Sequence, residues 1–191
     1  MKIILASKSK RRQELLKMIN LNYEVVPALK EEIIDNNLTY LQNCINISLN
    51  KALEVKDKTM GDRIIISCDT IVVKDNKIYG KPKNSEEAYN MLKKLSNTSH
   101  DVISCLTVLQ VKNNVEKVFQ KQGFGRVYID SLTDQEILNW IATNNPYDKA
   151  GGYAIQEEFG KYIFKVEGDY YSIVGLPLNE LYRILKELEI V

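Results

Sequence analysis

The sequence predicts a mixed α/β protein, with two lobes that share one β-sheet. Ile64–Val73 is rich in β-branched residues, and Val102–Val111 and Val115–Ile129 are typical of long antiparallel strands around the turn Asn113-Asn114. Other segments place apolar residues at helical spacing, which predicts helices against the sheet. The 191 residues, 45% of them hydrophobic, are enough for one domain or two closely joined lobes with a packed core.

The N-terminal third is predicted to alternate strands and helices. Ile3–Ala6 is a short apolar strand, and the polar stretch after it leads into a helix whose apolar residues are Leu15, Leu16 and Ile19. Tyr23–Pro27 alternates enough to form a second strand. A long amphipathic helix follows, and its predicted apolar face consists of Leu41, Cys44, Ile45, Leu49, Ala52 and Leu53.

Turn and capping residues mark the remaining elements. These are a hairpin turn at Lys74–Lys77, helix starts at Asn84 with Glu87 and at Thr133 with Glu136, a helix end at Asn144–Pro146, a strand over Ile163–Val166, a turn at Gly168-Asp169, and a helix beginning near Pro177. Residues 148–152 are rich in glycine and polar groups, so we expect them not to form a packed element.

The charge balance argues against a protein that binds nucleic acid. Lys and Arg number 26 and Asp and Glu 25, so the formal net charge is +1, whereas such proteins usually carry a basic excess. The apolar run at Ile3–Ala6 is too short for a signal peptide or a membrane span. We therefore expect a cytoplasmic protein that binds neither nucleic acid nor a membrane.

The cysteines and the single histidine are expected to be structural. Cys44, Cys68 and Cys105 are far apart, and no CxxC pair or Cys/His metal spacing is present, so buried free thiols are the simpler interpretation. His100 is the only histidine, and no Ser–His–acid spacing accompanies it. We assign it no catalytic role.

Four polar residues, Ser7, Ser9, Arg11 and Arg12, lie between the first strand and the first helix. Backbone N–H groups at a helix start, two hydroxyls and two guanidiniums together suit a polyphosphate. Because cations oppose the helix dipole at this end, two arginines there favour an anionic partner. The alternative is a basic helix start that faces solvent, and this segment alone does not decide between the two.

Asp69 lies within or at the end of the most apolar predicted strand, next to Thr70. A carboxylate embedded in Ile/Val sequence costs free energy unless it is paired, bound to a metal or placed at a strand end. On a rigid strand it can hold Mg²⁺ or take a proton from water. The alternative is an aspartate that caps the following turn.

Three further segments carry candidate groups. Lys81 is held between a glycine and a proline, and Glu31-Glu32 supplies carboxylates, although paired surface acids are usually only solvated. Residues 148–156 combine a glycine-rich backbone that permits close approach with Gln156, whose amide can read the edge of a base. None of these segments is decisive alone.

Taken together and in order, these segments resemble the Maf family of nucleoside triphosphate pyrophosphatases. The matching pieces are Leu5–Leu16, Asp69–Val72, Gly80–Pro82, Asp148–Gly151, Ile155-Gln156, and Gly168–Tyr171 with Val174–Leu178. They extend over nearly the whole chain. Six parts in the right order are far more specific than any one of them, so the resemblance favours the anion-site and carboxylate interpretations.

The resemblance implies a single Maf-like domain over residues 1–191, with an elongated mixed β-sheet, flanking helices and two lobes around a central nucleotide-binding cleft, often in a homodimer. It implies hydrolysis of a nucleoside triphosphate with Mg²⁺, Mn²⁺ or another divalent cation. By position, Asp69 corresponds to the catalytic carboxylate, and Glu32 and Asp69 to metal ligands, with either of them open as the group that activates water. The corresponding substrate-binding residues are Ser7, Arg11, Arg12, Lys51, Thr70, Lys81 and Gln156.

Arg11, Thr70 and Gln156 fall where the family separates its substrate subgroups, and here they are similar to the subgroup that cleaves dTTP and UTP, with modified pyrimidine triphosphates as further candidates. The 7-methyl-GTP subgroup tends to carry an aromatic residue, Gln and Glu at these three positions. The chain departs from the family at three points: Lys10 replaces a proline, Cys68 replaces an alanine, and Glu157-Glu158 stands where glycine is frequent. The last departure bears on the shape of the base pocket.

Three alternative functions are distinguished by sequence or by assay. A P-loop kinase or NTPase is excluded because no GxxxxGK[ST] motif is present. A 7-methyl-GTP pyrophosphatase, and a non-catalytic nucleotide-binding regulator of cell division, stay open at this stage.

Overall fold

The computed structural model describes all 191 residues. Its elements in chain order are β1 (Lys2–Leu5), α1 (Lys10–Met18), β2 (Glu24–Val25), α2 (Tyr40–Asp57), β3 (Arg63–Lys74), β4 (Lys77–Tyr79), α3 (Ser85–Leu95), β5 (Ser99–Lys112), β6 (Val115–Ile129), α4 (Asp134–Thr143), the 3₁₀ turns η1 (Pro146–Asp148), η2 (Ala150–Gly152) and η3 (Glu158–Tyr162), β7 (Ile163–Gly168), α5 (Tyr170–Val174) and α6 (Leu178–Glu187). The seven strands form one mixed sheet in the order β2-β1-β3-β5-β6-β7, with β4 paired to β3. The predicted fold class, a mixed sheet flanked by helices, is confirmed. None of the helices combines the length and the apolar character that a membrane span requires.

The chain folds into two compact units. Unit 1 comprises Met1–Asp69, Ser104–Gly123 and Gly175–Val191, and unit 2 comprises Thr70–Ile103 and Phe124–Val174. The boundary at Asp69 and Thr70 falls inside β3, so these two neighbouring residues belong to different units.

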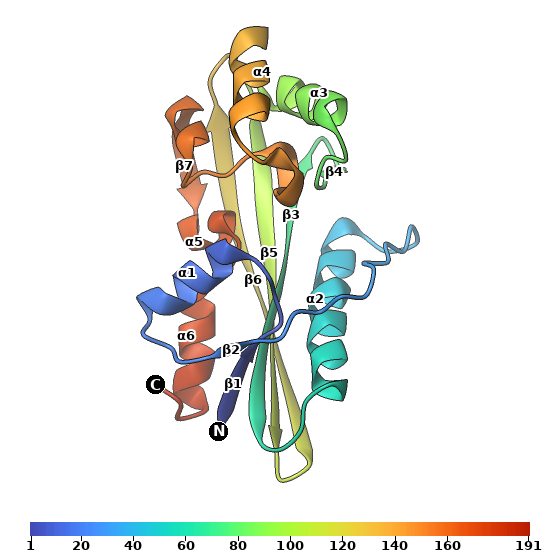
Figure 1. Cartoon of the computed structure of the whole chain (residues 1–191), viewed down its shortest axis with the longest axis vertical. Helices are drawn as coiled ribbons and strands as arrows, with labels where there is room; N and C mark the ends of the chain where they lie inside the picture. Colours follow the sequence, from blue (N-terminus) through green and yellow to red (C-terminus); the bar gives the residue numbers. More distant parts are fainter. The chain divides into compact units, whose positions relative to one another are not determined.

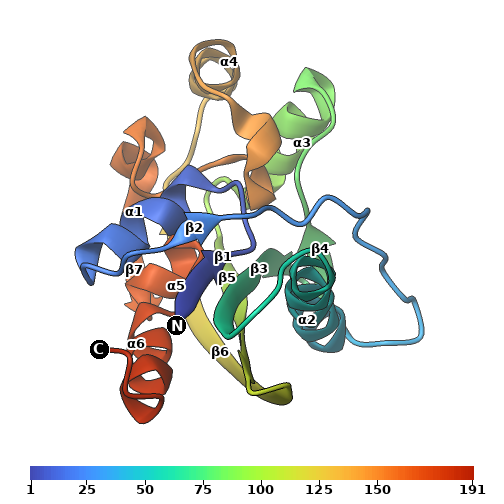
Figure 2. The same cartoon turned by 60° about the horizontal axis from the view of Figure 1, so that its bottom comes forward.

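Unit 1 is built around β1, which pairs in parallel with both β2 and β3. In Figures 1 and 2, α1 and α6 lie on one side of these strands and α2 on the other. Because helices cover both faces, the strands are apolar on both, as buried parallel strands usually are. Their core includes the fully buried residues Ile4, Ile65, Leu109, Ala52 and Val55.

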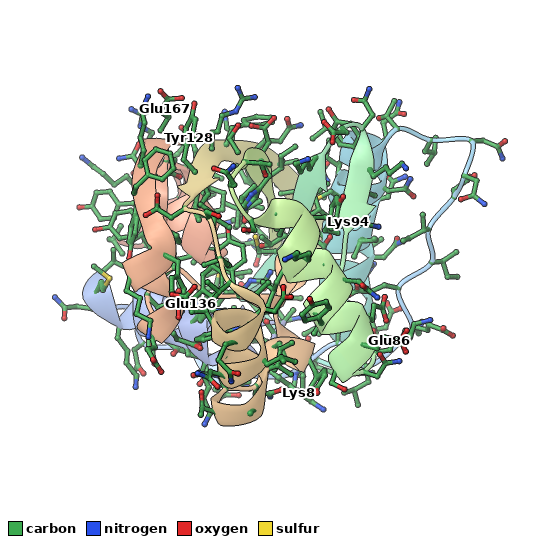
Figure 3. All side chains as sticks on the ribbon, turned by 90° about the horizontal axis from the view of Figure 1, so that it is seen from above. Lys8, Glu86, Lys94, Tyr128, Glu136 and Glu167 are labelled. Atoms are coloured by element: carbon green, nitrogen blue, oxygen red, sulfur yellow. The ribbon has the colours of Figure 1, made fainter.

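Unit 2 contains the β3–β4 hairpin, the antiparallel pair of β6 and β7, and the helices α3 and α4, which lie side by side (Figure 1). Asp75 and Asn76 take φ values of 50° and 58° in the hairpin turn, which short polar side chains tolerate. Figure 3 shows Tyr128 of β6 beside Glu167 of β7, where the tyrosine hydroxyl donates to the carboxylate at 2.8 Å. The core of the unit is aromatic, with Trp140 packed edge-on against Phe159.

The predicted helix starts are confirmed in atomic detail. Asn84 accepts a hydrogen bond from the Glu87 backbone N–H at 2.8 Å. Thr133 and Glu136 form a reciprocal capping box, with the threonine N–H donating to the glutamate at 2.8 Å. Each bond pairs a backbone N–H at the helix start that has no partner within the helix.

Four expectations differ from the structure. Residues 148–152 do pack: Lys149, Gly151 and Gly152 are buried, because bare glycine backbone fits where a side chain cannot. The second strand is limited to Glu24 and Val25, the two residues that pair with β1. On α2, Leu41, Ile45, Leu49 and Leu53 are only half-buried, since the helix turns Ile47, Ser48 and Val55 inward as well as Cys44 and Ala52. The turn at Gly168-Asp169 leads into an unexpected short helix, α5, capped by Asp169.

Candidate active site

Asp69 lies well inside β3 rather than at its end. Its exposed fraction is 7%; Cys68 before it on the strand is buried, and Thr70 after it is half-buried. An aspartate in the middle of a strand cannot serve to cap the following turn, which removes the structural alternative left open by the sequence. A buried carboxylate then needs a charged or hydrogen-bonding partner.

Lys51 of α2 supplies that partner. Its ammonium lies 2.8 Å from Asp69 Oδ1 and 2.7 Å from Glu32 Oε1, so one positive charge bridges two carboxylates. The side chain of Lys51 is only 17% exposed and that of Asp69 9%, whereas that of Glu32 is 43% exposed. Three residues from a loop, a helix and a strand therefore meet in unit 1 with a local charge of about −1.

Arg12 is fixed by two contacts in unit 1. Its Nε donates to the carbonyl of Gly175 at 2.9 Å, and its Nη1 donates to the Ser7 hydroxyl at 3.1 Å. Ser7 is buried and also accepts the Ser9 backbone N–H at 3.2 Å. Ser9 in turn is the N-cap of α1 and accepts the Arg12 N–H at 3.4 Å.

The start of α1 has the composition of an anion site. The first turn contains no acidic residue, while Arg11 and Arg12 are half-buried and Lys8 and Lys10 are exposed. A guanidinium held against a serine and a backbone carbonyl loses less conformational entropy when it contacts an anion than a free one does. The geometry supports preorganised cation groups at this helix start, as a polyphosphate would require.

The segment that carries Glu31 and Glu32 is irregular, and α2 anchors it on both sides. Glu54 accepts the backbone N–H groups of Leu29 at 2.9 Å and Lys30 at 3.1 Å. Asn43 accepts the Asp35 N–H at 2.8 Å and donates to the Asp35 carbonyl at 2.9 Å. The pKa of Glu54 is lowered to about 2, mainly by the hydrogen bond from Lys58 and further by the backbone N–H groups of Leu29 and Lys30.

Unit 2 carries Thr70, Lys81 and Gln156. Thr70 is half-buried and directly follows Asp69 on β3, and Lys81 is exposed after β4. The Gly80 carbonyl accepts the Gly151 N–H at 3.0 Å, so the segment before Lys81 is joined to the glycine-rich loop. Gln156 is exposed in the turn from Ala154 to Glu157, which the Glu157 N–H closes onto the Ala154 carbonyl at 3.3 Å.

Several residues that shape this region have no assignment from the sequence. Asn43 and Glu54 are buried polar residues on the inner face of α2, and the apolar face predicted from the sequence did not include them. Lys149 lies in the motif Asp148–Gly151, but its burial depends on packing that the motif does not reveal. Gly175 contributes only its backbone carbonyl to Arg12, so its residue type gave no indication.

The three cysteines are buried free thiols, as expected. Cys44 and Cys68 direct their thiols at the Asp69 backbone carbonyl, at 3.6 and 3.5 Å. A hydrogen bond with Cys105, and burial, raise the pKa of Cys44, and burial raises the pKa of Cys68 to about 11. The thiols of Cys44 and Cys68 are therefore neutral packing groups and not nucleophiles.

His100 is also structural. Its Nε2 lies 2.5 Å from the Tyr153 hydroxyl in the core of unit 2, while Nδ1 is buried without a partner. Burial lowers the pKa of His100 to about 4. A neutral imidazole with one hydrogen-bonded nitrogen fits the expectation that it has no catalytic role.

Glu32 and Asp69 are the two carboxylates beside Lys51 that could hold a divalent cation. No group of three or more His, Cys, Asp or Glu residues converges as a closed metal site. Mg²⁺, however, is commonly held by one or two carboxylates together with water and substrate phosphates. Glu32 and Asp69 already share one cation, the Lys51 ammonium, so the two carboxylates fit that kind of site.

Comparisons with known proteins match the whole chain. A family model described as "Maf-like protein" matches residues 2–188. A dTTP/UTP pyrophosphatase of Clostridium botulinum (strain Eklund 17B / Type B) is 42% identical and covers 98% of this chain and 99% of its own length. A dTTP/UTP pyrophosphatase of Carboxydothermus hydrogenoformans is also 42% identical, over 98% of each chain.

A solved structure supports the fold alone. A HAM1 protein from Coxiella burnetii is 13% identical over 98% of this chain and 99% of that chain, with a TM-score of 0.52. The family rests instead on the sequence match, which includes each motif described above and extends almost from end to end. On that evidence the chain belongs to the Maf family.

Proposed function

We propose that the protein hydrolyses nucleoside triphosphates between the α and β phosphates, releasing a nucleoside monophosphate and pyrophosphate, with dTTP and UTP as its main substrates. The observation that carries the proposal is the bridge of Lys51 to Asp69 and Glu32, which presents a buried, paired carboxylate on a rigid strand. The two relatives at 42% identity carry the name dTTP/UTP pyrophosphatase, which supports these bases; modified pyrimidine triphosphates are further candidates.

In the proposed reaction, Asp69 orients or deprotonates the attacking water, with Glu32 as the second candidate for that step. The α-phosphorus–oxygen bond to the β phosphate breaks, and the electron pair leaves with pyrophosphate. Arg12, fixed by Ser7 and Gly175, stabilises phosphate charge together with Arg11, Lys51 and Lys81. Thr70 and Gln156 contact the base side of the substrate.

Glu32 and Asp69 would hold Mg²⁺, Mn²⁺ or another divalent cation together with substrate phosphates. Such a cation supplies Lewis-acid activation of the α phosphorus and offsets the charge of the triphosphate. What the chain itself contributes is the fixed pair of carboxylates and the Lys51 ammonium that keeps them in place.

We further propose that the enzyme works in the cytoplasm as a homodimer. The buried, unpaired thiols are typical of proteins from a reducing compartment. The homodimer is proposed from the family resemblance, and sedimentation of the purified protein at several concentrations tests it.

The activity is tested with a panel of dTTP, UTP, CTP and 7-methyl-GTP, with Mg²⁺ present and pyrophosphate as the readout. We expect release from dTTP and UTP, and a loss of roughly 10²- to 10⁴-fold in Asp69→Asn, because that carboxylate is the proposed base. Asp75→Asn is the matched control, since Asp75 lies in the exposed hairpin turn that ends the same strand and should not change the rate.

Three outcomes would contradict the proposal. A wild-type protein that releases no pyrophosphate from any of the four would contradict the proposed activity and favour a nucleotide-binding regulator. Preference for 7-methyl-GTP would overturn the proposed bases. Near-normal turnover in Asp69→Asn would remove Asp69 as the base and leave Glu32.

A further inference from the structure

Lys149 is the only buried Lys, Arg, Asp or Glu of unit 2, with an exposed fraction of 4%. Its ammonium donates to the Asn145 carbonyl at 2.6 Å and lies 3.0 Å from Asp148 Oδ1 and 3.2 Å from Glu157 Oε2. Three acceptors match the three N–H groups of a lysine. A buried charge with all its donors paired holds its partners firmly, because releasing one leaves the charge uncompensated.

Of these partners, Glu157 is the farthest from Lys149 along the chain, and it immediately follows Gln156. Its backbone is fixed as well: the Glu157 N–H donates to the Ala154 carbonyl at 3.3 Å, and the Glu157 carbonyl accepts the Gly160 N–H at 2.9 Å. Ala154, at the other end of the turn, is buried. Gln156 therefore projects from a short turn with both ends tied, and the side chain of Glu157 is paired with Lys149.

The same lysine segment is joined to the phosphate-binding side of unit 2. The Gly151 N–H donates to the Gly80 carbonyl, directly before Lys81, and the Gly152 carbonyl accepts the Trp140 indole N–H at 2.9 Å. A Cβ on Gly151 would lie 3.1 Å from Val72, and its φ is +74°, so this backbone leaves little freedom to adjust. The backbone that carries Lys149 is thus held rigidly where the lysine pairs with Glu157.

We propose that the Lys149–Glu157 ion pair determines base selectivity by fixing the turn that presents the Gln156 carboxamide to the substrate base. This inference rests on the proposed function. A carboxamide distinguishes bases only while its donor and acceptor ends keep one orientation, since a misaligned hydrogen bond gives up its contribution. Lys149 and Glu157 are positioning residues, and Gln156 is the group that touches the base.

The test compares Glu157→Ala with Glu158→Ala. Glu158 is the matched control because it is the next residue, is 58% exposed and pairs with exposed Lys161 at 2.7 Å. We would measure kcat and KM for dTTP, UTP, CTP and 7-methyl-GTP by pyrophosphate release, together with the thermal unfolding midpoint. Lys149→Met and the double variant Lys149→Met with Glu157→Ala complete a cycle, and Glu157→Ala stands alone should the lysine variant not fold.

We expect Glu157→Ala to raise KM for dTTP and UTP by roughly three- to tenfold with kcat within about twofold, as expected for one misaligned hydrogen bond. The preference for dTTP over CTP should fall by a similar factor, while Glu158→Ala changes none of these values. An unchanged preference in Glu157→Ala, or an equal loss on every nucleotide, would overturn the inference while the wild-type activity upholds the proposed function. A wild-type protein inactive on all four nucleotides would overturn both.

Discussion

Lys51 holds two acidic side chains, Asp69 and Glu32, close together. Its ammonium lies within 2.8 Å of Asp69 and 2.7 Å of Glu32, and it is the one cation that the structure places between them. Two carboxylates brought together without a cation repel each other. The lysine ammonium offsets that repulsion and lets the two acidic side chains lie close together.

Replacing this lysine tests that role. We expect Lys51→Met to lower kcat/KM by about 100-fold, the usual effect of removing one charge contact in an active site. Lys56→Met is the control, since Lys56 lies on the same helix and pairs with exposed Glu116. A near-normal kcat/KM in Lys51→Met would contradict this account.

His100 predicts how the stability of unit 2 depends on pH. Its pKa is lowered from 6.5 to about 4 by burial, so the unfolded chain binds a proton between these values and the folded chain does not. The free energy of unfolding should fall by about 3 kcal/mol as pH drops from 6.5 to about 4, and this contribution is fully present above pH 6.5.

Denaturant titrations of the wild type and His100→Gln at several pH values measure the difference. The imidazole is the only one in the chain, so its proton resonances give the pKa directly. Equal pH slopes in the two proteins, or an imidazole that titrates near 6.5, would show that burial does not control this group.

Among the secondary-structure elements, α2 (Tyr40–Asp57) positions the site residues Lys51 and Glu32 of unit 1. It carries Lys51, and through Asn43 and Glu54 it fixes both sides of the irregular segment that contains Glu32. The segment has no hydrogen-bonded ladder of its own, so its conformation depends on this helix.

Glu54→Gln should loosen that segment, because the paired carboxylate has a pKa lowered to about 2 and is a stronger acceptor than a neutral amide. We expect hydrogen exchange at the Leu29 and Lys30 amides to rise about tenfold and KM to increase through Glu32, with the fold retained. Asp57→Asn on the exposed side of the same helix is the control. Unchanged exchange at both amides would contradict the anchoring role.

Much of this arrangement can be predicted from local sequence, but contacts between residues that are distant in the chain cannot. The caps at Asn84 and Thr133 are readable because side chain and helix start are neighbours in the chain. The position of Glu32 is not readable, since distant residues of α2 fix its segment. The packing of Gly151 and Gly152 also escaped prediction, because hydropathy reports side chains and these residues have none.

At the scale of the whole molecule, catalysis is expected to depend on a divalent cation. Glu32 and Asp69 provide two carboxylates and no closed set of ligands, so the cation should exchange freely with solution. We expect EDTA to abolish pyrophosphate release and added Mg²⁺ or Mn²⁺ to restore it. Full turnover in excess chelator would contradict a role for the metal.

The distribution of rare residues gives this molecule two independent internal reporters. All three cysteines are buried in unit 1, whereas the single tryptophan and the single histidine are buried in unit 2. Thiol labelling thus follows the opening of one half of the protein, and indole fluorescence follows the other. Their midpoints in urea coincide if the chain unfolds as one cooperative domain and separate if it does not.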